Sequence, residues 1–282
     1  MTVKQFKIIL GLCKKQPWLE DKESELTKLL FTDCKTEDER KLILELLERF
    51  VHISHQYYSL LIKELAEAIV TDSLESSSTQ IVAMTGDYNT DSAQFVSYGL
   101  KPRLEKAGWR NHVSITQFQR AFKTYKASGF VHKDIVLVDE FIGSGKTVIG
   151  RVNKLNRMFK DAGYNDVTIR VKTLISSQVG IDIARSSGID IESLVYLDRG
   201  ISDYYPSEMV SDKLNLMAKL EGLLSTSYNG RELPNLGYGE TECLYTRDDG
   251  NTPNSVFPIF WWPFLKDESE RDTLLVRAMA DA

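Results

Sequence analysis

Cysteine and histidine are scarce in this sequence, and none of them falls into the spacing of a metal site. Cys13, Cys34 and Cys243 are far apart in a chain of 282 residues, and the four histidines are scattered. No CxxC pair exists, which argues against zinc-binding and disulfide-framework proteins. We expect reduced, buried thiols. Because no signal peptide is recognisable either, the sequence predicts a cytoplasmic protein.

Long hydrophobic runs and an excess of positive charge are also missing. No stretch approaches the roughly 20 apolar residues that cross a bilayer, so no membrane span is expected. The chain has 35 basic and 40 acidic residues, and its formal net charge is -5. A mildly acidic protein is not expected to bind nucleic acid or anionic membranes broadly.

Hydrophobic periodicity divides the chain into three predicted regions. Residues 1–76 have helical spacing of apolar residues, and Thr36 with Glu39 predicts a capping box. Residues 77–205 alternate short apolar strands with helical segments, which predicts a parallel sheet flanked by helices. Residues 206–282 contain a helix, a long loop, an aromatic-rich segment and a terminal helix over 266–282. The expected fold class is therefore α/β, with a Rossmann-like core, an N-terminal helical extension and a C-terminal aromatic-rich extension.

The segment with the clearest chemistry is DIVLVDEFIGSGKTVIG, residues 134–150. Its Gly-Ser-Gly-Lys-Thr ending is similar to a nucleotide-binding P-loop, which requires a further glycine at position 140. That position holds Glu140. The charge and the bulk of a carboxylate oppose wrapping of the backbone around phosphates, so the P-loop interpretation is disfavoured.

The same residues suit a sugar phosphate better. A buried strand is expected to end in Asp139 and Glu140, whose carboxylates accept hydrogen bonds from hydroxyl groups. A short turn then opens a helix. The free amides of that helix start, with the hydroxyls of Ser144 and Thr147, suit a phosphate monoester. A pentose 5-phosphate presents both kinds of partner, so the pattern predicts a site for such a compound.

The stretch VLVDEFIGSGKT resembles the phosphoribosyl-pyrophosphate motif of type I phosphoribosyltransferases. That motif has an apolar strand, two acidic residues, two mostly apolar residues and a hydroxyl-rich glycine turn. The sequence departs from it at Glu140, where aspartate is usual, and at Gly143, where a hydroxyl residue is usual. The resemblance implies that Asp139 and Glu140 hold the ribose hydroxyls. It assigns the 5-phosphate to Gly143, Ser144, Gly145, Lys146 and Thr147.

The resemblance also implies a pyrophosphate loop after the first strand of the core. The candidates there are Thr85, Gly86 and Asp87. Asp87 would repel pyrophosphate unless Mg²⁺ lies between them. Mg²⁺ is therefore expected through bound pyrophosphate and ribose, and no protein metal site is predicted.

A basic segment, residues 115–130, lies between this strand and the motif, where the family has a mobile loop that covers its site. By resemblance, Lys123 is expected to neutralise the leaving pyrophosphate, with Arg120 and Lys126 as alternatives. The competing interpretation is a surface helix whose charges are merely solvated.

More loosely, the chain resembles the divergent phosphoribosyltransferase-like proteins of bacterial conflict loci, including some associated with retrons. The form DEFIGSGKT and the segment TPNSVFPIFWWPF, residues 252–264, carry this resemblance. It implies antiviral defence and a protein or nucleoprotein partner from the same locus. The aromatic segment is expected either to pack in a core or lid, or to form a hood in which Trp261 and Trp262 stack a base and Asn254 reads its edge.

Three functions stay open at this point. The first is a phosphoribosyltransferase-type enzyme that binds phosphoribosyl pyrophosphate with Mg²⁺. The second is a non-catalytic nucleotide-sensing or interaction module with the same fold, which the acidic first loop favours. The third is an enzyme that cleaves an N-glycosidic bond. The acceptor base and the oligomeric state do not follow from the sequence.

Overall fold

The computed structural model describes residues 1–86 and 91–279, and it groups the chain into two compact units. Unit 2 is Gln56–Leu197. Unit 1 combines residues 1–55 with the chain from Asp198 onward. These units do not coincide with the three regions expected from the sequence, since nearly all of α4 (His55–Val70) is grouped with the sheet and the first 55 residues are grouped with the C-terminal segment.

The core of unit 2 is a five-stranded sheet in the order β3-β2-β4-β5-β6, and every neighbouring pair is parallel. This arrangement confirms the predicted α/β fold class with a parallel sheet. The strands are β2 (Thr79–Ala83), β3 (Val113–Ile115), β4 (Asp134–Ile142), β5 (Thr168–Ser177) and β6 (Asp190–Leu197).

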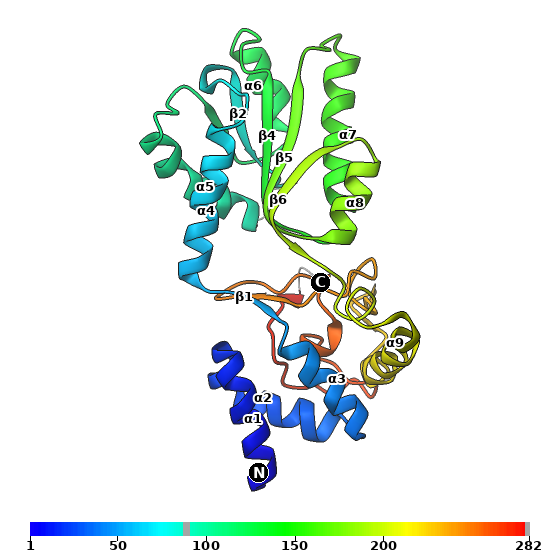
Figure 1. Ribbon diagram of the computed structural model, residues 1–282. Helices are drawn as coiled ribbons and strands as arrows, with labels where there is room; N and C mark the ends of the chain where they lie inside the picture. The colour runs from blue at the N-terminus through cyan, green and yellow to red at the C-terminus, as the bar shows by residue number, and fades with distance from the viewer. Residues whose placement is uncertain (87–90, 280–282) are drawn as a thin grey trace. The chain divides into compact units, whose positions relative to one another are not determined.

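Helices cover both faces of this sheet. One helix connects β2 to β3, which is the edge strand next to it. The later connections, from β3 to β4, from β4 to β5 and from β5 to β6, run across the sheet in the opposite direction, toward the other edge. Since crossovers between parallel strands are right-handed, the two directions put their helices on opposite faces. Figure 1 shows α4 and α5 on one side and α7 and α8 on the other. The helices are α5 (Ser92–Lys106), α6 (Arg120–Ala127), α7 (Lys146–Asp161) and α8 (Gln178–Ser186).

The strand order creates one topological switch point, between β2 and β4. These strands are neighbours, but the helices that follow them lie on opposite faces of the sheet. The backbone N–H of Met84 donates to the carbonyl of Val138 at 2.9 Å, which extends the pairing to the carboxyl edge. In open α/β sheets the crevice at such a point is where ligands bind. The residues that follow Ala83 and Val138 therefore meet at the expected ligand edge.

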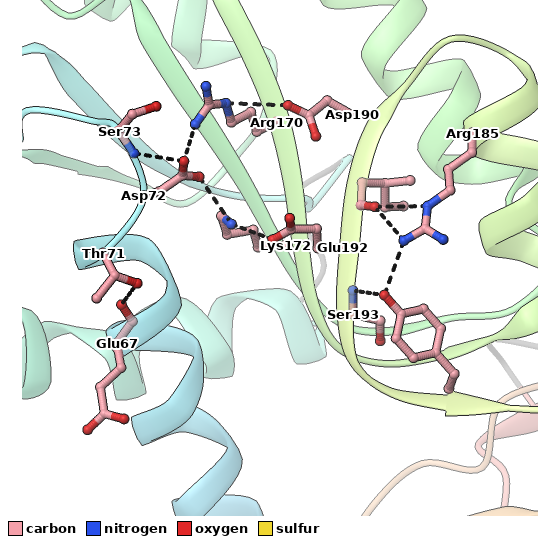
Figure 2. A network of polar contacts seen from close by, with 12 residues as sticks. Glu67, Thr71, Asp72, Ser73, Arg170, Lys172, Arg185, Asp190, Glu192 and Ser193 are labelled. Atoms are coloured by element: carbon pink, nitrogen blue, oxygen red, sulfur yellow. Dashed lines mark hydrogen bonds and ion pairs between the residues drawn. The ribbon is translucent and has the colours of Figure 1, made fainter.

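A polar network attaches the chain after α4 to the sheet (Figure 2). Asp72 pairs with Arg170 and Lys172, which are both on β5. The ammonium of Lys172 is buried, 3.1 Å from Asp72 Oδ2 and 2.7 Å from Glu192 Oε2. A buried charge is stable only when it is paired in this way. The network explains why α4 belongs to unit 2.

Unit 1 is mostly helical at its N-terminal part and irregular at its C-terminal part. Thr36 and Glu39 form the predicted capping box at the start of α3. Unit 1 contains α1 (Val3–Lys15), a 3₁₀ turn (Pro17–Lys22), α2 (Glu23–Lys28), a π turn (Leu29–Asp33), α3 (Glu37–Leu47), α9 (Ser207–Glu221) and a second 3₁₀ turn (Pro258–Phe260). Its strands are β1 (Val51–Ile53), which pairs in parallel with β9 (Tyr245–Arg247), and the hairpin of β7 (Ser227–Tyr228) and β8 (Arg231–Glu232).

Two local predictions for unit 1 are wrong. No strand was expected before residue 77, yet β1 forms by pairing with a segment far along the chain. The described part of the expected terminal helix, residues 266–279, holds no α-helix. Its backbone is used in tertiary hydrogen bonds instead, as where the N–H of Thr252 donates to the carbonyl of Val276 at 3.0 Å. Tertiary pairing overrides local propensity in both places.

No helix in the described parts of the chain has the length and the apolar character that crossing a bilayer requires.

Candidate ligand site at the carboxyl ends of β2 and β4

The motif strand extends farther than the sequence suggested, because β4 continues to Ile142. Asp139 and Glu140 therefore lie within the strand, and successive side chains of a strand point to opposite faces. Asp139 is on the face of α7, like Ile135 and Leu137 before it. Glu140 is on the other face, where its Oε2 lies 3.5 Å from the hydroxyl of Tyr58 on α4.

Asp139 is the carboxylate that faces the switch point. Its Oδ1 accepts the backbone N–H of Glu140 at 2.7 Å. Burial raises the pKa of Asp139 to about 7, and the nearby charges of Asp91 and Glu140 act in the same direction. The N–H of Glu140 and the guanidinium of Arg151 oppose this rise in the pKa. A carboxyl group with a pKa near neutrality can either accept or donate a hydrogen bond at this position.

The motif turn is held by the start of α8. The hydroxyl of Ser177 donates to the carbonyl of Gly143 at 2.6 Å and accepts the N–H of Gly180 at 2.9 Å. Gly145 has a φ of +77°, a region that favours glycine. A Cβ on Gly180 would lie 1.9 Å from the carbonyl oxygen of Gly143, and a Cβ on Gly145 would lie 2.6 Å from that of Gly180. The turn therefore rests directly on the backbone of α8.

The helix after this turn retains the geometry expected of an anion site. No side chain caps the start of α7, where Gly145 is the N-cap residue. Ser144 is buried, whereas Lys146 and Thr147 are exposed. The uncapped end of a long helix attracts negative charge. The structure thus places the five phosphate-binding candidates in one compact turn.

The first loop lies on the other side of the switch point. Thr85 is buried, and its hydroxyl donates to Asp91 Oδ1 at 2.6 Å. The carbonyl of Gly86 accepts a hydrogen bond from Gln119 Nε2 at 3.1 Å. Asp87, the third candidate for this loop, lies outside the described residues. Thr85 and Gly86 are therefore brought to the edge where Asp139 also lies.

Arg151 joins the two sides of the site, and sequence reasoning missed it. Its guanidinium donates to the carbonyl of Met84. A Cβ placed on Gly86 would come within 2.8 Å of the same guanidinium. The only signal in the sequence is its position, one helical turn beyond Thr147 on α7. Arg151 supplies a half-buried positive charge beside Asp139 and the first loop.

The basic segment is a helix, and its charges are exposed. Arg120, Lys123 and Lys126 all lie on α6 with exposed side chains. No contact among the described residues joins the ammonium of Lys123 to Asp139 or to the motif turn. The start of the segment is nevertheless close to the first loop, since the N–H of Phe118 donates to the carbonyl of Thr85 at 3.2 Å. The assignment of Lys123 to the leaving group stays a prediction.

The two tryptophans of the aromatic segment do not form an open stacking surface. Trp261 and Trp262 are each 1% exposed inside unit 1. Their indole N–H groups donate to the carbonyl of Val256 at 2.8 Å and to the hydroxyl of Ser225 at 2.9 Å. The hypothesis that they stack a base is therefore wrong, and core packing accounts for both residues.

For a site that binds phosphoribosyl pyrophosphate, removing the charge of Arg151 should weaken that binding about ten- to hundredfold. Arg151→Gln removes the cation beside Asp139 and the hydrogen bond from this charged donor to the carbonyl of Met84, which holds the first loop. An interaction of this kind is worth about 1.5–3 kcal/mol. The matched control is Arg157→Gln, on the same helix with an exposed side chain. Isothermal calorimetry on both variants measures the difference. Equal affinities for the two variants would remove Arg151 from the site.

Comparison with known proteins agrees with the motif. A family model described as PRTase-CE matches residues 18–272. No curated protein matches the chain. Solved structures that are similar to the chain include two phosphoribosyltransferases and one hypothetical protein, each at 13–14% sequence identity.

An orotate phosphoribosyltransferase from Aeropyrum pernix is 14% identical, with a TM-score of 0.31, over 57% of this chain and 76% of that one. A xanthine-guanine-hypoxanthine phosphoribosyltransferase from Helicobacter pylori is 14% identical, with a TM-score of 0.30, over 52% and 82%. A hypothetical protein from Neisseria gonorrhoeae with bound ppGpp is 13% identical, with a TM-score of 0.32, over 60% and 96%.

Proposed function

This chain belongs to the PRTase-CE family, which is phosphoribosyltransferase-like, and from this premise we propose that unit 2 binds a ribose 5-phosphate compound. The observation that supports the proposal most is a coincidence of motif and topology. The acidic strand and the glycine turn of residues 139–147 lie at the one switch point of the sheet, next to the first loop. Phosphoribosyl pyrophosphate or a nucleotide has the matching groups.

Each end of the ligand has a partner in this assignment. Asp139 accepts a ribose hydroxyl, because it faces the switch point. The turn from Gly143 to Thr147 binds the 5-phosphate through the uncapped start of α7. Glu140 is buried against Tyr58, on the face of the sheet opposite to Asp139. We therefore give Asp139 the leading role and Glu140 a secondary one.

The leaving-group side consists of Thr85, Gly86 and Arg151. When bound with pyrophosphate, Mg²⁺ would supply additional positive charge as the bond at C1 of the ribose breaks. Among the described residues, no group of three His, Cys, Asp or Glu side chains is placed to hold a metal ion. The oxygens of the ligand and water would provide most of its coordination, which is usual for magnesium with phosphates. Arg151 orients the first loop through the carbonyl of Met84.

A non-catalytic nucleotide sensor is the second candidate. The burial of Glu140 favours it, because a phosphoribosyltransferase motif normally presents both acids to the sugar. A module with one available carboxylate and an intact phosphate turn would still bind a nucleoside monophosphate. The link to antiviral defence, a partner from a defence locus, the cleavage of an N-glycosidic bond and the cytoplasmic location stay predictions of the sequence.

Calorimetry with three ligands separates these functions. Phosphoribosyl pyrophosphate, a nucleoside monophosphate and ATP are titrated with and without Mg²⁺. Magnesium-dependent binding of phosphoribosyl pyrophosphate supports the enzyme, and binding of the monophosphate alone supports the sensor. Preferred binding and hydrolysis of ATP would reject both. The structure already disfavours that outcome, because residue 140 lies in a strand where a P-loop would need its first turn.

The carboxylates are tested by Asp139→Asn, Glu140→Gln and the double variant. We expect Asp139→Asn to weaken ligand binding at least about tenfold, the double variant to abolish it, and Glu140→Gln alone to have the smaller effect. The control is Asp161→Asn, at the exposed end of α7. Circular dichroism confirms that each variant is folded. Unchanged affinity in the double variant would show that these acids do not hold the sugar.

A further inference from the structure

The first helix of the chain, α1, has an apolar stripe that its own unit does not cover. Val3, Phe6 and Leu10 are 73%, 50% and 42% exposed. A different set of apolar side chains, Ile9, Leu12 and Cys13, packs into unit 1. Together these residues form one broad apolar face of α1, of which one part is buried within unit 1 and the other part is exposed.

The exposed stripe has the spacing of a helix–helix seam. Val3, Phe6 and Leu10 are separated by three and then four residues, which is the a and d pattern of a heptad. At about 100° per residue they fall within an arc of about 60°. A seam of this width suits one partner helix, whereas helices that lie in a membrane surface have a broader apolar face.

The charges beside the stripe are all of one sign. α1 contains four lysines and no acidic residue. Lys7 and Lys14 are exposed and flank the seam one heptad apart, at the position that forms ion pairs between helices. Lys15 already pairs with Glu48 at 2.7 Å. A partner with acidic flanking residues complements this edge, and a second antiparallel copy of α1 would oppose lysine with lysine.

The helix also lies outside the region that the family model matches, which begins at residue 18. We propose that α1 docks an amphipathic helix of another protein whose apolar seam is flanked by glutamate or aspartate.

Designed peptides test the proposal on the full-length protein. The probe is a labelled three-heptad peptide with leucine at positions a and d and glutamate at e and g, and the control peptide carries lysine in place of glutamate. Fluorescence anisotropy should show binding of the glutamate peptide and at least tenfold weaker binding of the lysine peptide. Lys7→Glu with Lys14→Glu should reverse this preference.

Two further variants address the apolar seam. Phe6→Ser with Leu10→Ser should weaken binding of the glutamate peptide about tenfold or more, because both side chains lose contact with the partner. Met209→Ser, an exposed apolar residue on α9 of the same unit, should leave it unchanged. Sedimentation measures self-association of the protein, and binding to vesicles of phosphatidylcholine and phosphatidylglycerol measures its affinity for a membrane.

Three results would overturn the proposal. The first is equal affinity for both peptides or no binding of either. The second is self-association that the seam substitutions abolish, which would make a second copy the occupant. The third is binding to vesicles that the seam substitutions also abolish, which would make a membrane the occupant.

Discussion

Replacing Gly180 by alanine should destabilise unit 2 and abolish ligand binding, whereas alanine at Gly150 should do neither. The two glycines lie in helices of the same unit. A Cβ at Gly180 would come 1.9 Å from the carbonyl oxygen of Gly143, and a Cβ at Gly150 would meet nothing within 4 Å. The two alanine variants therefore compare a position that is in close contact with another backbone segment and a position that has no such neighbour.

The expected cost follows from the displacement that the new methyl group requires. Carbon and oxygen normally approach to about 3.3 Å, so α8 and the motif turn must separate by more than 1 Å. Overpacking of this kind costs about 1–3 kcal/mol and sometimes more. Alanine is the better helix former, so Gly150→Ala should raise the free energy of unfolding by about 0.5–1 kcal/mol.

The loss of binding has a separate reason. The hydroxyl of Ser177 holds both Gly143 and Gly180, so a shift between the turn and α8 breaks this bridge. The amides that we propose to bind the phosphate would then shift by about 1 Å, and displacements of this size are enough to disrupt a precisely positioned site. Urea unfolding followed by circular dichroism, with calorimetry of phosphoribosyl pyrophosphate, measures both effects. Equal unfolding midpoints for the two alanine variants would contradict the close approach.

The sequence was sufficient to predict the α/β fold class with a parallel sheet, but not the order of its strands. Strand-and-helix alternation predicted the parallel sheet, and a local signal such as the pair Thr36 and Glu39 predicted a helix start. Both depend on residues that are close in the chain, where period and chemistry are visible. The match of Asp139 and Glu140 to the two acidic positions of the motif can likewise be recognised from neighbouring residues alone.

The features of the site that the sequence did not predict depend on contacts between residues that are distant in the chain. Arg151 and Gly180 have no distinctive neighbours in the sequence, and only the folded chain brings them to Gly86 and Gly143. The extension of β4 through Ile142 arises because β5 continues beside it, up to the pair Ile142 and Ser176. An acidic pair that was expected at a strand end is instead part of the ladder, which separates the two carboxylates.

A buried acid in unit 1 should make the protein less stable as the pH rises. Glu221, the last residue of α9, is 2% exposed, and its carboxylate accepts the backbone N–H of Leu236 at 3.0 Å. Burial raises the pKa of Glu221 from 4.5 to about 8. The N–H of Leu236 opposes this rise, and the nearby charge of Glu242 adds to it.

The sign of the effect follows from proton counting. Below about pH 4.5 the carboxyl is protonated in both the folded and the unfolded chain, so it contributes no pH dependence. Between pH 4.5 and about 8 the folded chain keeps the proton that the unfolded chain has lost. Unfolding then releases a proton, and the free energy of unfolding falls as the pH rises through this window. Above about pH 8 the contribution is constant.

We therefore expect the stability advantage of Glu221→Gln over the original protein to grow from pH 5 to about pH 8 and then to stay constant. The difference between pKa values of 4.5 and about 8 corresponds to on the order of 5 kcal/mol. Glutamine retains an acceptor for the N–H of Leu236 and cannot ionise. Urea unfolding across this pH range measures the gap, with the exposed Glu240→Gln as the control. If the curves for Glu221→Gln and the original protein stay parallel at every pH, Glu221 does not hold a proton in the folded state.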